Sequence, residues 1–294
     1  MMSIFFAVAA GITLALQNSL SGLMTPHVGA MGASFVGFTV QLVLLVLYHI
    51  IREHKLPAIG PTPPVYYTGG LLAGVLVACN GYCVSVLGSS VTACCSVVGQ
   101  ILMSALVDHF ALFGKERNRF SLRRLPGFLI MVTGVLLINL IGGSGMGEAK
   151  LGYLLLALTT GFCSVFVRSM NFKVSNLLGS TIAGGTVNSI GGLISALVLF
   201  LVLSGFKPDF AAFAQAPFPC YFAGLFGVLC MLFNIAAYRK SKVFYATIFM
   251  LVGQVAASIA MDVLIFHSLS LGKCIGIAVV IAGIMLDKFF DRGK

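Results

Sequence analysis

Ten stretches of about 20 mostly apolar residues run through this chain, with no room between them for a soluble domain. A helix needs roughly 20 such residues to cross the hydrocarbon core of a membrane. The stretches are twice as long as a barrel strand and lack its alternation, so they predict helices, which satisfy their own backbone hydrogen bonds in lipid. The predicted spans are Ile4–Met24, Gly29–Ile51, Tyr66–Leu87, Val91–Phe113, Leu125–Ile141, Leu151–Met170, Gly179–Leu203, Phe218–Tyr238, Val243–Phe266 and Gly272–Phe289.

The composition excludes a soluble globule. Hydrophobic residues make up 59% of the chain and charged residues 9%, whereas soluble domains carry roughly 25% charged residues. The 34 glycines suit a membrane protein because glycine allows helices to approach closely. The net charge of +10 does not indicate a nucleic-acid partner, because the basic residues flank the apolar spans.

The distribution of basic residues predicts the orientation in the membrane. With ten spans, fifteen of the 18 Lys and Arg residues fall on the side that also holds both termini, and Lys150, Lys207 and Lys273 fall on the other. Basic residues in short loops favour the cytoplasm. We therefore expect a multi-pass protein of the plasma membrane, the inner membrane of a bacterium, with both termini cytoplasmic.

The chain also contains an internal repeat. A single constant offset places Gly99 and Gln100 on Gly253 and Gln254, and it places three further polar pairs in register. Those pairs are Ser104 with Ser258, Asp108 with Asp262 and Asn80 with Asn234. A slightly smaller offset aligns the preceding helices of each half, Gly11 with Gly161 among them.

Each half therefore holds five predicted helices. The predicted division is residues 1–142 for the first repeat, 143–150 for a linker and 151–294 for the second. Five is odd, so the second copy enters the membrane from the opposite side, and the copies are inverted. Such symmetry is typical of secondary transporters, whose halves exchange conformations around a site near the midplane.

Several motifs resemble a known family. They are Gly99-Gln100, the runs 106–114 (LVDHFALFG) and 121–127 (SLRRLPG), and 134–137 (GVLL). These resemble the YdcZ-like branch of the drug/metabolite transporter (DMT) superfamily, usually found as five-helix chains. The second half departs from the pattern, reading MDVLIF at 261–266 with no basic run after it. The resemblance implies a fused, diverged tandem pair with the superfamily's all-α, ten-helix, inverted-repeat fold, a central cavity and a small-molecule cargo.

Two matched polar seams carry the site hypothesis. Gln100, Ser104 and Asp108 recur at four-residue spacing and share one helix face, and Gln254, Ser258 and Asp262 repeat it. The mid-span glutamines are expected to face substrate. The aspartates, nearer opposite ends of their helices, are expected to gate the path or carry protons, because buried carboxylates in a membrane are costly and usually functional. The alternative is that these groups only join helices or tie helix ends.

Further polar residues lie inside the spans. Asn80, Asn234, Gln17 and Asn18 complete the predicted substrate-binding set, and Gln41 and Asn188 lack matched partners. Arg168 aligns with Asn18 near a helix end, so extension toward water is favoured over an anion site. With two buried carboxylates and few buried basic groups, the sequence favours a cationic, zwitterionic or neutral substrate.

The predicted function is secondary active transport of a small polar or amphipathic metabolite by alternating access, with protons as the candidate coupling ion. A passive channel or facilitator is the alternative, and a membrane enzyme is disfavoured because no nucleophile–base pair or metal motif appears. No cofactor or metal is expected. The chain is expected to act as a monomer or a homodimer, and a basic cluster is available to anionic lipids. The cluster comprises Lys115, Arg117, Arg119, Arg123 and Arg124.

Overall fold

The computed structural model is a bundle of helices. It describes residues 2–53, 63–110, 126–127, 129–130, 133–134, 137, 148–206, 211–240, 243–266 and 271–291, with some side chains left out within these ranges. No strand occurs in these ranges. Within them, six helices are long and apolar enough to cross a membrane, and two shorter apolar helices cover Ser89–Ser104 and Cys274–Gly283. Most of the predicted span Leu125–Ile141 lies outside the described residues, so the count of ten helices stays a prediction.

The first two predicted spans form one bent helix, α1 (Met2–Glu53), of 52 residues. A helix rises by about 1.5 Å per residue, so a straight helix of this length would be more than twice as long as the hydrocarbon core of a membrane is thick. The turn is at Gly29, whose φ of 74° suits glycine, just after Pro26. Gly179, the repeat counterpart of Gly29, has a φ of 66° and separates α5 (Glu148–Leu177) from α6 (Thr181–Leu203).

The third helix of each repeat begins in the same way. A short 3₁₀ turn, η1 (Pro64–Tyr67), leads into α2 (Thr68–Leu87), and η4 (Phe218–Phe222) leads into α8 (Ala223–Lys240). The two turns occupy equivalent positions of the two repeats. A short helix, α7 (Ala211–Gln215), precedes the second turn. Proline at the first positions of each turn costs no hydrogen bond there, because those backbone N–H groups have no helical partner.

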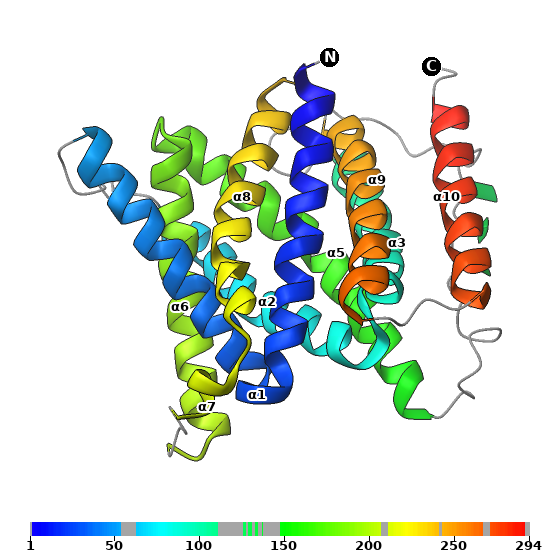
Figure 1. The fold of residues 1–294 in the computed structure, drawn as a ribbon. Helices are drawn as coiled ribbons and strands as arrows, with labels where there is room; N and C mark the ends of the chain where they lie inside the picture. The colour runs from blue at the N-terminus through cyan, green and yellow to red at the C-terminus, as the bar shows by residue number, and fades with distance from the viewer. Residues whose placement is uncertain are drawn as a thin grey trace.

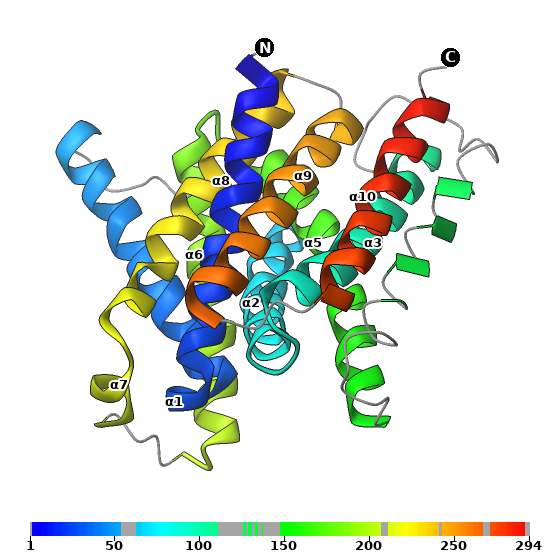
Figure 2. The same ribbon diagram turned by 45° about the vertical axis from the view of Figure 1, so that its right-hand side comes forward.

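The fourth helices of the two repeats are α3 (Ser89–His109) and α9 (Val243–Met261), which begin at equivalent positions. Gly88, with a φ of 87°, separates α2 from α3. A π-helical turn, η5 (Asp262–Phe266), continues α9, and α10 (Leu271–Asp291) lies at one side of the bundle in both ribbon views (Figures 1 and 2).

Equivalent helices of the two repeats run in opposite directions. In Figure 1, α1 descends from its first turn, whereas α5, its repeat counterpart, rises from the lower right. The first turn of α1 and the last turn of α10 lie at the same end of the bundle in both views.

The repeats pack against each other through four glycines. A β-carbon on Gly11 of α1 would overlap the backbone of α9 at Met250, and one on Gly253 of α9 would overlap α1. The equivalent pair, Gly161 of α5 and Gly99 of α3, approaches in the same way. Each repeat's first helix therefore crosses the fourth helix of the other repeat at backbone contact, which only residues without a side chain allow.

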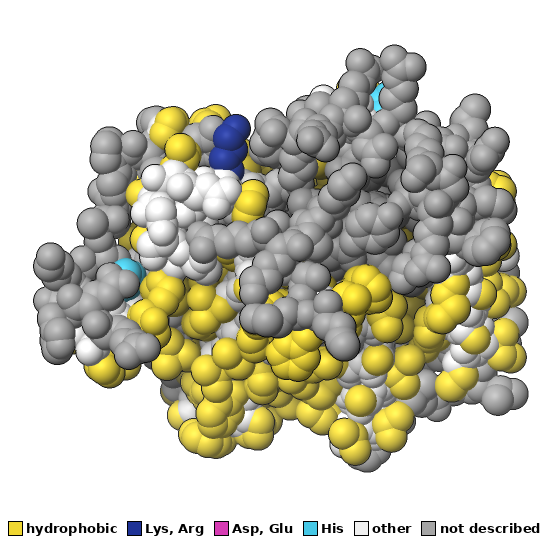
Figure 3. Space-filling model, turned by 90° about the horizontal axis from the view of Figure 1, so that it is seen from above, with side chains coloured by type: hydrophobic (Ala, Val, Ile, Leu, Met, Phe, Trp, Pro, Cys, Tyr) yellow, Lys and Arg dark blue, Asp and Glu magenta, His cyan; other side chains and the backbone are white. Residues whose placement is uncertain are grey.

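The outer flank is apolar. On α6, Ile194, Val198 and Val202 are each about half exposed. Figure 3 looks down on the end that carries the first turn of α1 and shows hydrophobic side chains gathered along one flank of the bundle. Apolar surface this extensive on helices of membrane-spanning length fits contact with lipid.

Candidate functional site

A cavity whose wall combines apolar and polar side chains lies between the repeats. It encloses about 130 Å³, which is far more than the roughly 10–15 Å³ that one water molecule needs on the same measure. Both arms of α1 and helices α2, α5, α6, α8 and α9 contribute to its wall. The lining residues are Leu14, Gln17, Asn18, Phe38, Gln41, Ala73, Leu76, Val77, Asn80, Ser164, Val167, Arg168, Asn171, Asn188, Gly227, Cys230, Met231, Asn234, Ile235 and Met250.

Side-chain amides dominate the polar part of this wall. They belong to Gln17, Asn18, Gln41, Asn80, Asn171, Asn188 and Asn234. An amide offers both donors and acceptors without a formal charge. A wall of this kind, set among aliphatic and aromatic groups, can bind a small solute that has polar groups at several positions.

Asn80 and Asn234 are repeat counterparts with different partners. The Asn80 side-chain oxygen accepts from Ser96 over 3.3 Å and from Thr160 over 3.2 Å, and its nitrogen donates to the Leu76 carbonyl over 3.0 Å. The Asn234 nitrogen instead meets the sulfur of Met250 at 3.4 Å. Met250 occupies the position equivalent to Ser96. The two asparagines therefore occupy equivalent positions of the repeats, but the groups that contact their side chains differ.

Arg168 places its guanidinium at the cavity wall. Its Nη2 donates to the Gln100 side-chain oxygen over 2.7 Å and to Ser164 Oγ over 3.0 Å. Its Nη1 lies 3.3 Å from Met250 Sδ, and its Nε is buried without a hydrogen-bond partner. The sequence favoured extension toward water at a helix end, and the structure corrects this: the side chain turns inward, because Ser164 one turn earlier and Gln100 on α3 supply acceptors.

Gln100 and Gln254 meet directly. Gln100 Nε2 donates to Gln254 Oε1 over 3.2 Å, and both side chains are 1% exposed. Since a guanidinium can only donate, the bond from Arg168 fixes which atom of Gln100 is the oxygen. Neither glutamine is among the residues that line the cavity. They form a bridge between α3 and α9 that contacts the cavity through Arg168.

The remaining predicted residues are distributed as follows. Gln17, Asn18, Asn80 and Asn234 line the cavity. Ser104 and Ser258 are buried but do not line it, and Ser104 Oγ donates to the Gln100 carbonyl of its own helix. Asp108 lies in the last turn of α3, and its side chain is outside the described part of the structure, as is the whole basic cluster at Lys115, Arg117, Arg119, Arg123 and Arg124.

Asp262 binds the start of another helix. Its carboxylate accepts from the backbone N–H groups of Ser89 and Ser90 over 2.8 and 3.0 Å, and the Ser90 hydroxyl also donates to it. Ser89 and Ser90 are the first residues of α3, whose N–H groups have no partner within the helix. A carboxylate is favourable at this end of the helix dipole. Asp262 thus joins the end of α9 to the start of α3.

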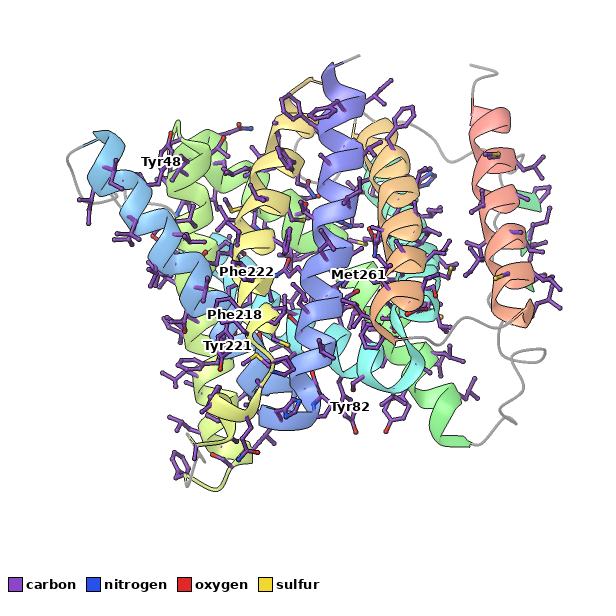
Figure 4. All side chains as sticks on the ribbon, in the orientation of Figure 1. Tyr48, Tyr82, Phe218, Tyr221, Phe222 and Met261 are labelled. Atoms are coloured by element: carbon purple, nitrogen blue, oxygen red, sulfur yellow. The ribbon has the colours of Figure 1, made fainter. Side chains whose placement is uncertain are left out.

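An apolar cluster lies beside this junction. Leu20 of α1, Ala223 of α8 and Met261 of α9 are buried together, with Leu16 and Phe226 packed against them. Met261 is marked in Figure 4, where it lies between α9 and the first arm of α1. The cluster and the Asp262 contacts join the halves on the side of the bundle away from the first turn of α1.

The site contains residues that the sequence did not assign to it. Gln41, Asn188, Asn171 and Arg168 all line the cavity. One signal was available for Arg168: the repeat places it on Asn18, which was assigned to the site. Gln41 and Asn188 have no polar counterpart in the other repeat, so symmetry could not find them.

The paired halves, the apolar outer flank and an amide-containing cavity between the repeats define the molecule as a membrane protein of the transporter type. The chain belongs to the DMT_YdcZ family, described as "Putative inner membrane exporter, YdcZ". The family model matches residues 2–137 and 152–286, one match in each half, so the chain is a tandem pair of the YdcZ-like unit.

The fold is shared with a solved structure, described only as "Crystal structure of protein". That structure is 15% identical and superimposes with a TM-score of 0.64, covering 96% of this chain and 98% of that chain. At this identity the likeness shows the fold alone. No curated protein matches the chain.

Proposed function

We propose that the protein is a secondary carrier that moves a small polar or amphipathic metabolite across the membrane by alternating access. The observation that carries the proposal is the amide-lined cavity built from both repeats. A site at the junction of two oppositely directed halves can be exposed to either side by rocking one half against the other. The family's description as an exporter supports transport and favours the outward direction.

The proposed orientation has both termini in the cytoplasm, as the basic residues predict. The junction at Asp262, Ser89 and Met261 then lies toward the outer face. In this arrangement Asp262 acts as a gate: its bonds to the start of α3 hold the outer side closed and break when that side opens. Asp108, its repeat counterpart, takes the equivalent role toward the cytoplasm.

Proton coupling is part of the proposal. A carboxylate that holds two backbone N–H groups must be ionised to accept both fully, so protonation of Asp262 weakens the junction. A proton taken up on one side and released on the other then accompanies each cycle. The test is transport by the Asp108→Asn, Asp262→Asn double variant in proteoliposomes with an imposed pH gradient. Retention of the full dependence on the gradient excludes this coupling route.

Counterflow distinguishes a carrier from the alternative, a passive channel or facilitator. Proteoliposomes are loaded with unlabelled solute and a labelled trace is added outside. A carrier accelerates uptake of the trace because loaded exchange avoids the return of the empty site, and a pore gives no such acceleration. Absence of counterflow for every solute that permeates through the protein contradicts the carrier model.

A further inference from the structure

The charge within the cavity differs from what the sequence favours. Arg168 is the one charged side chain among the described residues that line it. Asp262 is the one acidic side chain that the structure describes, and it is engaged at the start of α3. Hence Arg168 has no carboxylate partner within the described part of the chain. An ionisable group inside a membrane protein is costly and normally has a partner.

The hydrogen bonds of Arg168 are incomplete. Of the three nitrogens, Nη2 meets oxygen acceptors, Nη1 meets only a thioether sulfur, and Nε meets nothing. Sulfur in methionine is a weak acceptor. A half-buried guanidinium with such partners retains unused capacity to bind an anion, for which its planar set of donors is well suited.

A second donor converges on the same atom. Asn234 Nδ2 lies 3.4 Å from Met250 Sδ, and Arg168 Nη1 lies 3.3 Å from it. The two donors come from α8 and α5, and all three residues line the cavity. Two polar donors directed at one weak acceptor mark a position at which a negatively charged oxygen would bind better than the sulfur does.

We infer that the substrate carries an oxyanion, a carboxylate or a phosphate, that binds between Arg168 and Asn234 beside Met250. This inference rests on the proposed carrier function and specifies its substrate class. On binding, the anion accepts from Arg168 and Asn234 and displaces the Met250 sulfur from them. Gln100 and Ser164 keep Nη2 in place, and Gln254 supports Gln100. The side-chain amides of Gln17, Asn18 and Asn188 bind the polar groups on the rest of the substrate.

The first test is thermal stability of the purified protein with matched small molecules at constant ionic strength. The oxyanions are succinate, glycerol 3-phosphate and inorganic sulfate, the neutral counterparts are succinamide and glycerol, and putrescine is the cation. A ligand that binds the folded state raises the melting temperature. We expect at least one oxyanion to stabilise the protein and its neutral counterpart to have no effect. Succinate against glycerol 3-phosphate separates a carboxylate from a phosphate.

Variants then locate the site. Arg168→Gln is expected to weaken binding of that oxyanion at least tenfold, and Arg168→Lys to weaken it less. Lys173→Gln, which removes a basic residue from the same helix outside the cavity lining, is expected to leave it unchanged. Met250→Gln keeps the arginine and places an amide oxygen beside both donors, so it is expected to compete with the anion and weaken binding too.

The outcomes separate this inference from the carrier proposal. Unchanged affinity in Arg168→Gln and Met250→Gln, stabilisation by putrescine or the neutral compounds alone, or no response to any of the oxyanions overturns the anion site. Counterflow of a neutral or cationic solute then leaves the carrier function intact. An oxyanion that binds through Arg168 but shows no counterflow supports the anion site and contradicts the carrier function.

Discussion

Gln100 Nε2 donates to Gln254 Oε1 over 3.2 Å, so two residues at equivalent positions of the two repeats touch across the centre of the molecule. Repeat counterparts that touch lie next to the axis that relates the copies. The contact also lies beside the cavity, because Arg168 joins Gln100 to its wall. Any movement of one repeat against the other therefore changes the contact between these two side-chain amides.

Gln100→Ala is expected to destabilise the protein more than Gln254→Ala does. Loss of Gln100 leaves both Arg168 Nη2 and the Gln254 oxygen short of a partner, whereas loss of Gln254 frees only the Gln100 amide nitrogen. Each buried group left unpaired costs about 1–3 kcal/mol, with single bonds between membrane helices averaging roughly 0.6 kcal/mol. The free energies of unfolding of the two variants, measured in mixed detergent, provide the comparison. Equal losses contradict the chain of bonds from Arg168 to Gln254.

The same two variants test the role of the glutamines in binding. Both side chains lie behind the cavity wall, so they position Arg168 and do not contact solute in this state. Gln100→Ala is expected to weaken binding of a solute that Arg168 holds, and Gln254→Ala to weaken it less. Titration of the melting temperature with that solute gives both affinities. Unchanged affinity in both variants contradicts the positioning of Arg168 by the glutamines.

Gly99→Ala is expected to disrupt the crossing of α3 and α5. A β-carbon there overlaps the Leu158 carbonyl oxygen and the next turn of α5, and backbone cannot move aside as a flexible side chain can. Gly37→Ala is the matched control, since a β-carbon at this buried glycine meets nothing within 4 Å. The control is expected to be neutral or to stabilise by up to about 1 kcal/mol through helix propensity, and Gly99→Ala to cost about 1–3 kcal/mol from overpacking.

The thermal unfolding of these two glycine variants, measured side by side, decides the matter. Gly253→Ala, the repeat counterpart of Gly99→Ala, is expected to behave in the same way because its β-carbon overlaps the Val8 carbonyl of α1. A Gly99 variant as stable as the Gly37 variant is incompatible with backbone contact between the repeats.

The sequence predicted the framework of this molecule more fully than its site. The constant offsets between the halves predicted the paired helices, and the glycine pair Gly99 and Gly253 lies at the crossings that the repeat requires. Periodicity shows which face of a helix is polar, but it does not show which neighbour that face meets. Gln100 therefore appeared as a lining residue, whereas in the structure it bonds to Gln254 and Arg168.

Long side chains and tertiary register account for the other differences. The direction of the Arg168 side chain depends on Ser164 and Gln100. Ser164 lies on the same helix as Arg168, but Gln100 lies on α3, and the sequence does not show where α3 packs. The contact of Asp262 with Ser89 and Ser90 depends on the glycine turn at Gly88, which sets the first residue of α3. Sequence spacing predicted the burial of this aspartate but not what it holds.

Asp262→Asn is expected to weaken the junction of α9 with α3 more than Ser90→Ala does. The asparagine keeps one oxygen for one backbone N–H and turns its own amino group toward the other, and it loses the charge that the helix dipole favours. Loss of such a cap costs about 0.5–2 kcal/mol. Ser90→Ala removes one hydroxyl bond and leaves both backbone bonds intact. Chemical unfolding measures both, and a larger loss for Ser90→Ala contradicts the backbone cap.

Asn188→Leu and Asn80→Leu form the last comparison. Both residues line the cavity and are more than nine-tenths buried. The Asn188 side-chain oxygen has no hydrogen-bond partner, whereas the Asn80 oxygen accepts hydrogen bonds from two hydroxyl groups.

Asn80→Leu leaves Ser96 and Thr160 short of an acceptor and is expected to cost about 1–3 kcal/mol. Asn188→Leu removes an unpaired acceptor at similar volume and is expected to preserve or raise the stability of the protein. It is also expected to weaken the binding of a solute that donates a hydrogen bond to the Asn188 oxygen. Melting temperatures with and without solute measure both effects. A strong loss of stability in Asn188→Leu contradicts the assignment of its oxygen to the solute.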